Sequence, residues 1–109
     1  MRRRLGSQGR RLARMASPGR SGHDAVFATA FLGDLEYWVR HDRKLALRTL
    51  KIVDDILRHP FEGLGKPEPL RGNLAGLWSR RLSQEHRIVY EVADTSVRFL
   101  QCRYHYGRI

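Results

Sequence analysis

The sequence predicts a single α+β domain in which two helices precede an antiparallel sheet. Two helical patterns fall between residues 31 and 58, and three strand-like segments with short connections follow between residues 77 and 104. Helices followed by a run of strands are typical of the α+β class, because an antiparallel sheet needs one of its faces covered. The length of 109 residues allows one small domain.

A short apolar run opens the domain, and the first helix follows it. The run from Ala25 to Thr29 combines β-branched and aromatic side chains, which predicts a buried strand. Phe31, Leu35 and Trp38 are spaced by four and three residues. This spacing predicts an amphipathic helix from Phe31 to Arg40.

The second helix has the clearest pattern in the chain. Asp42 is suited to be its N-cap, because a short carboxylate side chain can accept from the first free backbone N–H groups. Pro60 ends it, because the residue before a proline avoids helical angles. An apolar stripe is expected on one side and a charged solvent face on the other. The stripe consists of Leu47, Leu50, Val53 and Leu57, and the charged face of Lys44, Arg48, Lys51, Asp55 and Arg58.

A long loop separates the helices from the strands. The segment from Pro60 to Gly76 is rich in proline and glycine, and loops of this length in small domains are often functional. Short connections after it predict hairpins. The strands are expected at Leu77–Leu82, His86–Val92 and Val97–Tyr104. Alternation places Arg87 on the face opposite Ile88 and Tyr90, so we expect its side chain to point away from the core.

The net charge of +10 is unevenly distributed. Residues 1–22 contain seven arginines and no acidic residue, whereas residues 23–109 carry a balance of only +3. We interpret residues 1–22 as a disordered basic extension, residues 23–106 as the folded domain and residues 107–109 as a short C-terminal extension. The basic segment suits a nucleic-acid-binding arm, a transit peptide or an over-long start. We favour the last, with Met15 as the initiator, because a complete domain follows it.

Composition excludes several classes of protein. Hydrophobic residues make up 41% of the chain, which suits a soluble globular core. No apolar run reaches the roughly 20 residues that cross a bilayer, so we expect no membrane association. The single cysteine, Cys102, excludes an internal disulfide framework and a cysteine-based zinc cluster. We therefore expect a cytoplasmic protein without metal or cofactor, in which Cys102 is a small core residue.

The last third of the chain concentrates residues that suit RNA chemistry. Glu68 lies between two prolines that stiffen its backbone, Arg87 lies on a strand and His105 lies near the C-terminus. Metal-independent RNA cleavage needs a base for the ribose 2′-OH, an acid for the departing 5′-oxygen and a cation at the phosphate. These three residues could fill those roles. The alternatives are that Glu68 is an ordinary loop acid and His105 an exposed terminal residue.

Other residues of this region also have two interpretations. Arg80 and Arg81 could hold phosphate oxygens with their guanidinium groups, or they could line a solvated strand edge. Trp78 could stack on a base, but tryptophans in strands are more often part of the core. We expect Tyr104 to be a half-buried core aromatic.

Four segments of the chain resemble the YoeB toxins in order and spacing. They are Pro60–Leu70, Gly76–Arg81, Glu85–Tyr90 and Cys102–Tyr106. The similarity is strongest from about Asp42 to Tyr106 and extends back to about Asp24. Four long blocks in register are far more specific than one short motif. Gly107 to Ile109 and residues 1–22 depart from the family pattern, and neither departure removes a matched functional residue.

The resemblance implies a RelE-like microbial ribonuclease fold and an mRNA endoribonuclease that cuts in the A site of the translating ribosome. It also implies a YefM/Phd-type antitoxin as partner and a homodimer. By position, Glu68 matches the general base, Arg87 the arginine that stabilises the transition state and His105 the general acid. Tyr106 matches the tyrosine that holds the scissile nucleotides. The basic residues expected to face RNA are Lys66, Arg71, Arg80 and Arg81.

Two functions from other classes compete with this one. The first is a non-catalytic toxin of the same superfamily that binds the ribosome or another target. The joint presence of Glu68, Arg87 and His105 argues against it. The second is a nucleic-acid-binding protein that acts mainly through its basic extension. The small charge balance of residues 23–109 argues against that function, because the excess charge lies outside the part with a defined shape.

Overall fold

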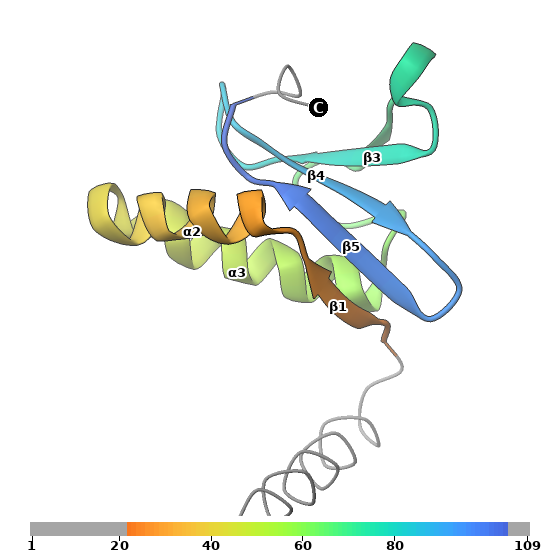
Figure 1. Ribbon diagram of the computed structural model, residues 1–109, viewed down its shortest axis with the longest axis horizontal. Coiled ribbons are helices and arrows are strands. Elements are labelled where there is room, and N and C mark those ends of the chain that lie inside the picture. Colours follow the sequence, from red (N-terminus) through yellow and green to blue (C-terminus); the bar gives the residue numbers. More distant parts are fainter. Residues whose placement is uncertain (1–21, 105–109) are drawn as a thin grey trace, which may run out of the picture.

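The computed structural model describes residues 22–104, in which two helices pack on one face of a five-stranded mixed sheet (Figure 1). The order of the strands across the sheet is β1-β5-β4-β3-β2. The predicted α+β class is confirmed. The helices are α2 (Thr29–His41) and α3 (Arg43–Arg58), and the strands are β1 (Asp24–Phe27), β2 (Glu68–Pro69), β3 (Leu77–Arg81), β4 (Arg87–Val92) and β5 (Ser96–Gln101). His105, Tyr106 and residues 1–21 lie outside the described residues.

The first strand forms where the apolar run predicts it, but it is not buried. β1 lies at the edge of the sheet, pairs in parallel with β5, and exposes all four of its residues. The predicted burial is therefore wrong, and the sheet is mixed rather than antiparallel throughout. The run is apolar because Phe27 packs from the edge against the rings of Phe31 and Phe99, at centroid distances of 5.2 and 5.1 Å.

The second helix begins and ends at the predicted signals. The Asp42 carboxylate accepts a hydrogen bond from the backbone N–H of Leu45 at 3.2 Å, which satisfies one of the free donors of the first turn. α3 stops at Arg58, two residues before Pro60. The same aspartate therefore separates α2 from α3 and lets the two helices run as one layer beside the sheet (Figure 1).

The buried face of α3 matches the predicted stripe at Val53, which is buried, and at Leu57, which packs against the core, but not at the other two positions. Leu47 and Leu50 are 57% and 50% exposed. The side chains that α3 buries are Ala46, Thr49, Ile52, Val53 and Ile56. The row that contains Ala46 and Thr49 repeats with the same spacing as the row that contains Leu47 and Leu50, one residue away. The helix buries the row with the smaller side chains, because Ala46 and Thr49 allow close packing against the sheet. The Thr49 hydroxyl donates to the Leu45 carbonyl at 2.7 Å, so its burial leaves no donor unsatisfied.

The core lies between the helix pair and one face of the sheet. Phe31 and Trp38 of α2 meet residues of β4 and β5 there, and Cys102 is buried as predicted. Within residues 22–104, neither helix has the length and apolar character that a membrane crossing requires. The long loop between α3 and β3 contains β2 and a single 3₁₀ turn at Gly72–Leu74. It carries Glu68 to the edge of the sheet.

Candidate active site

The pleat of β3 and β4 divides their side chains between two environments. Arg80 pairs with Ile88 on the face that the helices cover. Ser79 pairs with Val89, and alternation places Arg87 beside them on the face turned away from the helices. Two arginines that the sequence shows on neighbouring strands are thus separated by the thickness of the sheet.

Glu68 and Arg87 meet on the face away from the helices. Glu68 pairs with Ser79 across β2 and β3, and its Oε1 lies 3.6 Å from Nη1 of Arg87. The same Nη1 donates to the Ser79 hydroxyl at 3.5 Å. The Glu68 side chain is 59% exposed and that of Arg87 only 13%. A carboxylate open to solvent therefore faces a cation held within the surface.

Not all N–H donors of the Arg87 guanidinium have hydrogen-bond partners among the described residues. Its Nε is buried and has no hydrogen-bond partner among the described residues. The contact to Glu68 is longer than an ideal charged hydrogen bond, and the contact to Ser79 is also long. A guanidinium in this state can turn its donors to an incoming anion, and a partly desolvated cation interacts with such an anion more strongly than an exposed one.

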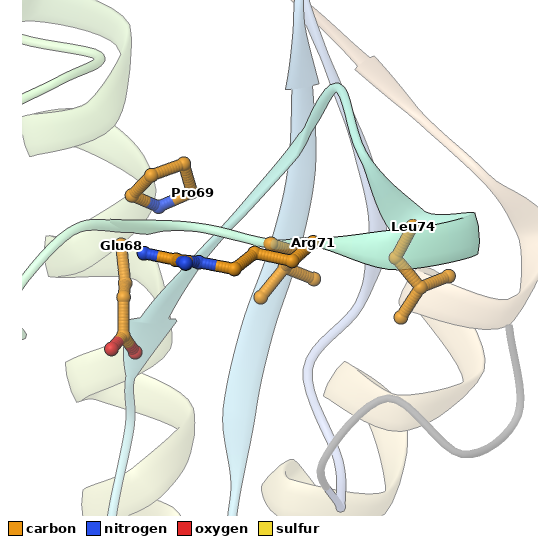
Figure 2. Close-up of a pocket in the computed structure, with 5 residues that line it drawn as sticks. Glu68, Pro69, Arg71 and Leu74 are labelled. Atoms are coloured by element: carbon orange, nitrogen blue, oxygen red, sulfur yellow. The ribbon is translucent and has the colours of Figure 1, made fainter.

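An open groove of about 270 Å³ adjoins Glu68. It is lined by Glu68, Pro69, Leu70, Arg71 and Leu74. Figure 2 shows the guanidinium of Arg71 extending along β2 toward Glu68. The groove is small beside typical enclosed ligand pockets of roughly 300–1,000 Å³. Its shape suits one unit of an extended ligand, with a carboxylate and a cation side by side.

Two further cations border this face. Arg81 pairs with Arg87 across β3 and β4, and its side chain is exposed. Its backbone N–H donates to the Gly65 carbonyl at 2.6 Å, which holds the exposed Lys66 next to the end of β3. The structure therefore brings Arg81 to the face that carries Arg87, and it places the backbone of Lys66 near the end of β3.

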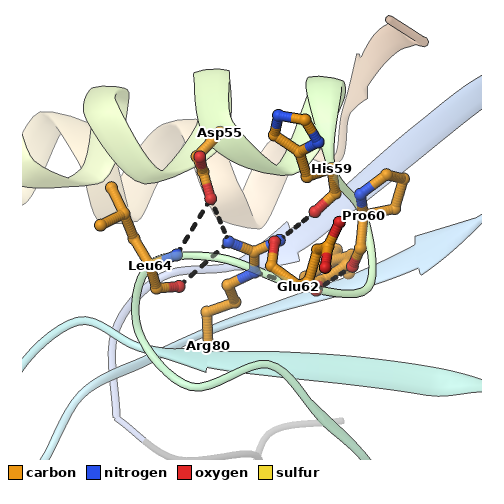
Figure 3. A network of polar contacts seen from close by, with 7 residues as sticks. Asp55, His59, Pro60, Glu62, Leu64 and Arg80 are labelled. Carbon is orange, nitrogen blue, oxygen red and sulfur yellow. Dashed lines mark hydrogen bonds and ion pairs between the residues drawn. The ribbon is translucent and has the colours of Figure 1, made fainter.

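Arg80 does not join them, and the prediction that it faces RNA is wrong. Its side chain is fully buried, and its three nitrogens donate to five acceptors (Figure 3). The acceptors are the Asp55 carboxylate at 2.5 Å, the Tyr90 hydroxyl at 3.2 Å and the carbonyl oxygens of His59, Glu62 and Leu64. Asp55, placed on the solvent face of α3 from the sequence, is instead its ion-pair partner. Arg80 fastens the loop after α3 to the sheet.

The Arg80 network shifts the titration of its two acidic partners. Burial by itself raises the pKa of Asp55, but the hydrogen bonds from Arg80 and from the Leu64 N–H outweigh it and bring the pKa below its ordinary value of 3.8. Burial raises the pKa of Tyr90 above 10.0, although the Arg80 guanidinium opposes this shift. Asp55 is therefore an anion and Tyr90 a neutral donor, whose hydroxyl donates to the Pro60 carbonyl at 2.7 Å.

Comparison with known proteins identifies the chain. Residues 27–106 match the YoeB-like toxin of bacterial type II toxin-antitoxin systems. The chain belongs to this family. Toxin YoeB of Mycobacterium bovis is 51% identical over 73 residues, which cover 67% of this chain and 86% of the relative. Toxin YoeB of Escherichia coli K12 is 49% identical over 73 residues, which cover 67% and 87%.

Solved structures of YoeB proteins share the fold. The YoeB/ParE toxin from Agrobacterium tumefaciens has a TM-score of 0.73 at 41% identity, over 76% of this chain and 99% of that one. The YoeB dimer from Staphylococcus aureus has a TM-score of 0.72 at 36% identity, over 79% and 100%. YoeB in a YoeB–YefM complex from the same species has a TM-score of 0.69 at 35% identity, over 77% and 98%. As a member of the YoeB family, the chain is a toxin of a toxin–antitoxin system.

In this YoeB-family toxin, polar residues that the sequence analysis missed hold the end of β5. The Asp34 carboxylate accepts from the Cys102 N–H at 3.0 Å, and the Trp38 indole donates to the Cys102 carbonyl at 2.9 Å. A signal was present, because Asp34 is an acid on the apolar face of α2, three residues after Phe31. Tyr104 is 45% exposed and does not pack into the core, so the predicted half burial holds but the predicted place in the core is wrong.

Proposed function

We propose that this toxin is a metal-independent, ribosome-dependent mRNA endoribonuclease that cuts A-site mRNA and so inhibits translation. Cleavage proceeds by attack of a ribose 2′-OH on the adjacent phosphate. The observation that carries the proposal is the pair of Glu68 and Arg87, 3.6 Å apart, in which the carboxylate is open to solvent and the guanidinium keeps a buried donor unused. Two of the three groups that the reaction needs are thereby in contact.

Glu68 is the proposed general base. Its carboxylate is exposed at the mouth of an open groove, so a ribose hydroxyl can approach it. Its backbone is stiffened by Pro67 and Pro69 and tied to Ser79 by strand pairing. A carboxylate is a weak base, and its effect depends on how well the 2′-OH is positioned. This supports dependence on the ribosome, which can hold the codon in place for an otherwise open site.

Arg87 is the proposed stabiliser of the transition state. Charge grows on the oxygens of the crowded phosphorus during attack, and a preorganised donor acts where that charge develops. The low exposure of Arg87 strengthens this interaction, and a planar guanidinium can present paired N–H donors to two phosphate oxygens. The exposed cations proposed to contact neighbouring phosphates are Lys66, Arg71 and Arg81.

His105 is the proposed general acid and Tyr106 the proposed holder of the scissile nucleotides. Support comes from the residue that precedes them, because the Tyr104 carbonyl accepts a hydrogen bond from the Arg87 N–H at 2.9 Å. Tyr104, the residue directly before His105 in the sequence, is therefore hydrogen-bonded to Arg87. A histidine suits proton donation to the leaving 5′-oxygen.

The proposal includes partners. The similar Staphylococcus aureus proteins are a YoeB dimer and YoeB in complex with YefM. We extend both to this chain, which would then be neutralised by a YefM/Phd-type antitoxin and would form a homodimer in the cytoplasm. Residues 1–22 and 107–109 are proposed to be extensions that the toxin domain does not need.

The decisive experiment maps the 5′ ends of cellular mRNA after brief induction of the toxin, with the Glu68→Gln variant induced in parallel. Cuts that cluster in codon frame in the wild type and vanish in the variant support the proposal. Arrested translation with no new 5′ ends would instead establish the non-catalytic alternative, a toxin that blocks the ribosome by binding.

A further inference from the structure

The backbone of Tyr104 is held from both sides by two consecutive residues. Its N–H donates to Nδ1 of His86 at 2.7 Å, and its carbonyl accepts from the Arg87 N–H at 2.9 Å. His86 is only 13% exposed, so this is a contact within the structure rather than a surface encounter. The imidazole therefore holds the same residue whose carbonyl accepts from the Arg87 N–H.

Tyr104 needs this support because its backbone conformation is unfavourable. Tyr104 has φ 66°, in the left-handed region that side chains other than glycine rarely occupy. The neighbouring Arg103 is also fixed, since its guanidinium lies 3.5 Å from the centre of the Tyr37 ring and its carbonyl accepts from the Gln101 amide at 3.1 Å. Residue 104 is thus an anchored bend in the segment that follows β5.

The hydrogen bond defines the protonation state of His86. A histidine nitrogen accepts an N–H only through a free lone pair, so this hydrogen bond requires a neutral ring with its proton on Nε2. The ring also packs against Trp38 and Tyr104, at 4.7 and 5.6 Å between centroids. Three neighbouring elements bring charged or titratable groups close to the His86 ring. Glu85 lies next to it in the sequence, with Oε1 3.9 Å from Nε2. The others are Arg103 and Tyr104 after β5, and Asp34, Tyr37 and His41 of α2.

We propose that His86 is a positioning residue for RNA cleavage, whose neutral imidazole holds the Tyr104 backbone against Arg87. Protonation of His86 removes the lone pair on Nδ1 and turns an acceptor into a donor that faces the Tyr104 N–H. The left-handed turn then loses one of its two anchors. Activity falls as pH is lowered, through a group that touches neither RNA nor the reacting atoms. The inference rests on the proposed function.

Two substitutions separate the hydrogen bond from the charge. His86→Asn keeps an acceptor, because the asparagine Oδ1 reaches the position of Nδ1, but this side chain cannot gain a proton. His86→Ala removes the acceptor. His59→Ala is the matched control, since it deletes an exposed imidazole and leaves in place the backbone carbonyl that accepts from Arg80.

The first measurement is single-turnover cleavage of ribosome-bound mRNA, with thermal melts of each variant. We expect His86→Ala to lower the rate at saturating ribosomes by on the order of 10²-fold, the effect of a small displacement of reacting groups. The ribosome concentration for half-maximal rate should hardly change, and His86→Asn should restore most of the rate. From about pH 8 to about pH 5, where imidazoles gain charge, the rate of the His86→Asn enzyme should fall less than that of the wild type.

The second measurement is hydrogen exchange of the Tyr104 amide, which does not depend on cleavage. We expect this amide to be protected in the wild type near neutral pH and in His86→Asn at every pH. It should lose protection in His86→Ala and in the acidified wild type. If His86→Ala does not fold, the pH dependence of cleavage and of Tyr104 amide protection in wild type and His86→Asn still tests whether His86 holds Tyr104.

Three results overturn the proposal. They are a wild-type cleavage rate in folded His86→Ala, an equal pH response of His86→Asn and wild type, and an unprotected Tyr104 amide in the wild type at neutral pH. Absence of cleavage by the wild type would refute the proposed function instead, and amide exchange would then decide alone whether His86 holds Tyr104.

Discussion

Arg80 and Arg87 lie on neighbouring strands of one sheet, yet their guanidinium groups are used in opposite ways. Arg80 faces the helices, has no exposed surface and donates from all three nitrogens. Arg87 faces away from them, makes two long contacts through one nitrogen and leaves its Nε without a partner in the described chain. A saturated arginine holds structure together, whereas an unsaturated one retains the capacity to bind a ligand.

The loops around the two arginines show the same contrast. The turn at residues 59–64 wraps around Arg80 and presents three carbonyl oxygens to it (Figure 3). The groove next to Glu68 is open, and its cation, Arg71, is exposed (Figure 2). Arg80, on the face covered by the helices, fixes the start of the loop after α3. The same loop carries Glu68 to the face turned away from the helices.

The largest effect is expected from removing the saturated arginine. Arg80→Ala should lower the free energy of unfolding by about 3–5 kcal/mol, because it leaves Asp55 and three carbonyl groups without their donor. Denaturant unfolding of purified protein measures this loss. A stability within about 1 kcal/mol of wild type, the size of an exposed ion pair, would show that the network is not structural.

Removing the unsaturated arginine should affect the rate instead. Arg87→Ala is expected to lower single-turnover cleavage of ribosome-bound mRNA by about 10²–10³-fold, the usual effect of losing a donor at the transition state. Its melting temperature should change less than that of Arg80→Ala. Arg98→Ala, which removes an exposed arginine from β5, serves as the control. If Arg87→Ala and Arg98→Ala cleave equally fast, Arg87 has no role at the phosphate.

A smaller loss of stability is expected at the turn that surrounds Arg80. Gly63 has φ +123°, and a Cβ placed there would lie 2.1 Å from Oδ2 of Asp55. Gly63→Ala should therefore cost about 1–3 kcal/mol in backbone strain, with displacement of Asp55 in addition. Gly72→Ala is a useful reference, because Gly72 also has positive φ but meets no atom within 4 Å. Equal melting temperatures for the two variants would argue against a contact with Asp55.

The smallest effect is expected on the stability of the protein at acidic pH. The pKa of Asp55 is lowered on folding, so its ionisation stabilises the protein above pH 3.8, and this contribution is lost as pH falls through the pKa of the folded state. The unfolding free energy of the wild type should fall more steeply below pH 3.8 than that of Asp55→Asn. Urea titrations at a series of pH values measure the two slopes. Parallel slopes would mean that Asp55 keeps its ordinary pKa.

Local signals account for most of the fold. Asp42 and Pro60 predict the ends of α3 because capping and proline sterics act within a few residues. The stripe predicted for α3 was right at Val53 and Leu57 and wrong at Leu47 and Leu50, because Leu47 and Ala46 belong to equally periodic rows and only tertiary packing selects between them. The predicted burial of β1 was wrong, because a short apolar run does not reveal whether its strand has one neighbouring strand or two.

The site was partly predictable for a related reason. Alternation along β4 correctly turns Arg87 away from Ile88, and that rule needs only the strand itself. Arg80 obeys the same rule, but its destination depends on Asp55, 25 residues earlier, and on a turn whose carbonyls point inward. His86 and Asp34 were missed because a side chain that satisfies a distant backbone group leaves no pattern in its own neighbourhood.

The strand that carries Glu68 has only two residues and lies at the edge of the sheet. Its register depends on two pairs with β3 and on the adjacent bond from the Leu70 N–H to the Leu77 carbonyl at 2.8 Å. Such an edge can open by local unfolding while the core of α3, β4 and β5 stays intact. On heating, cleavage should therefore disappear at a lower temperature than the helical circular dichroism signal. The temperature at which cleavage stops is then set by the pairing of β2 with β3 and not by the melting of the core.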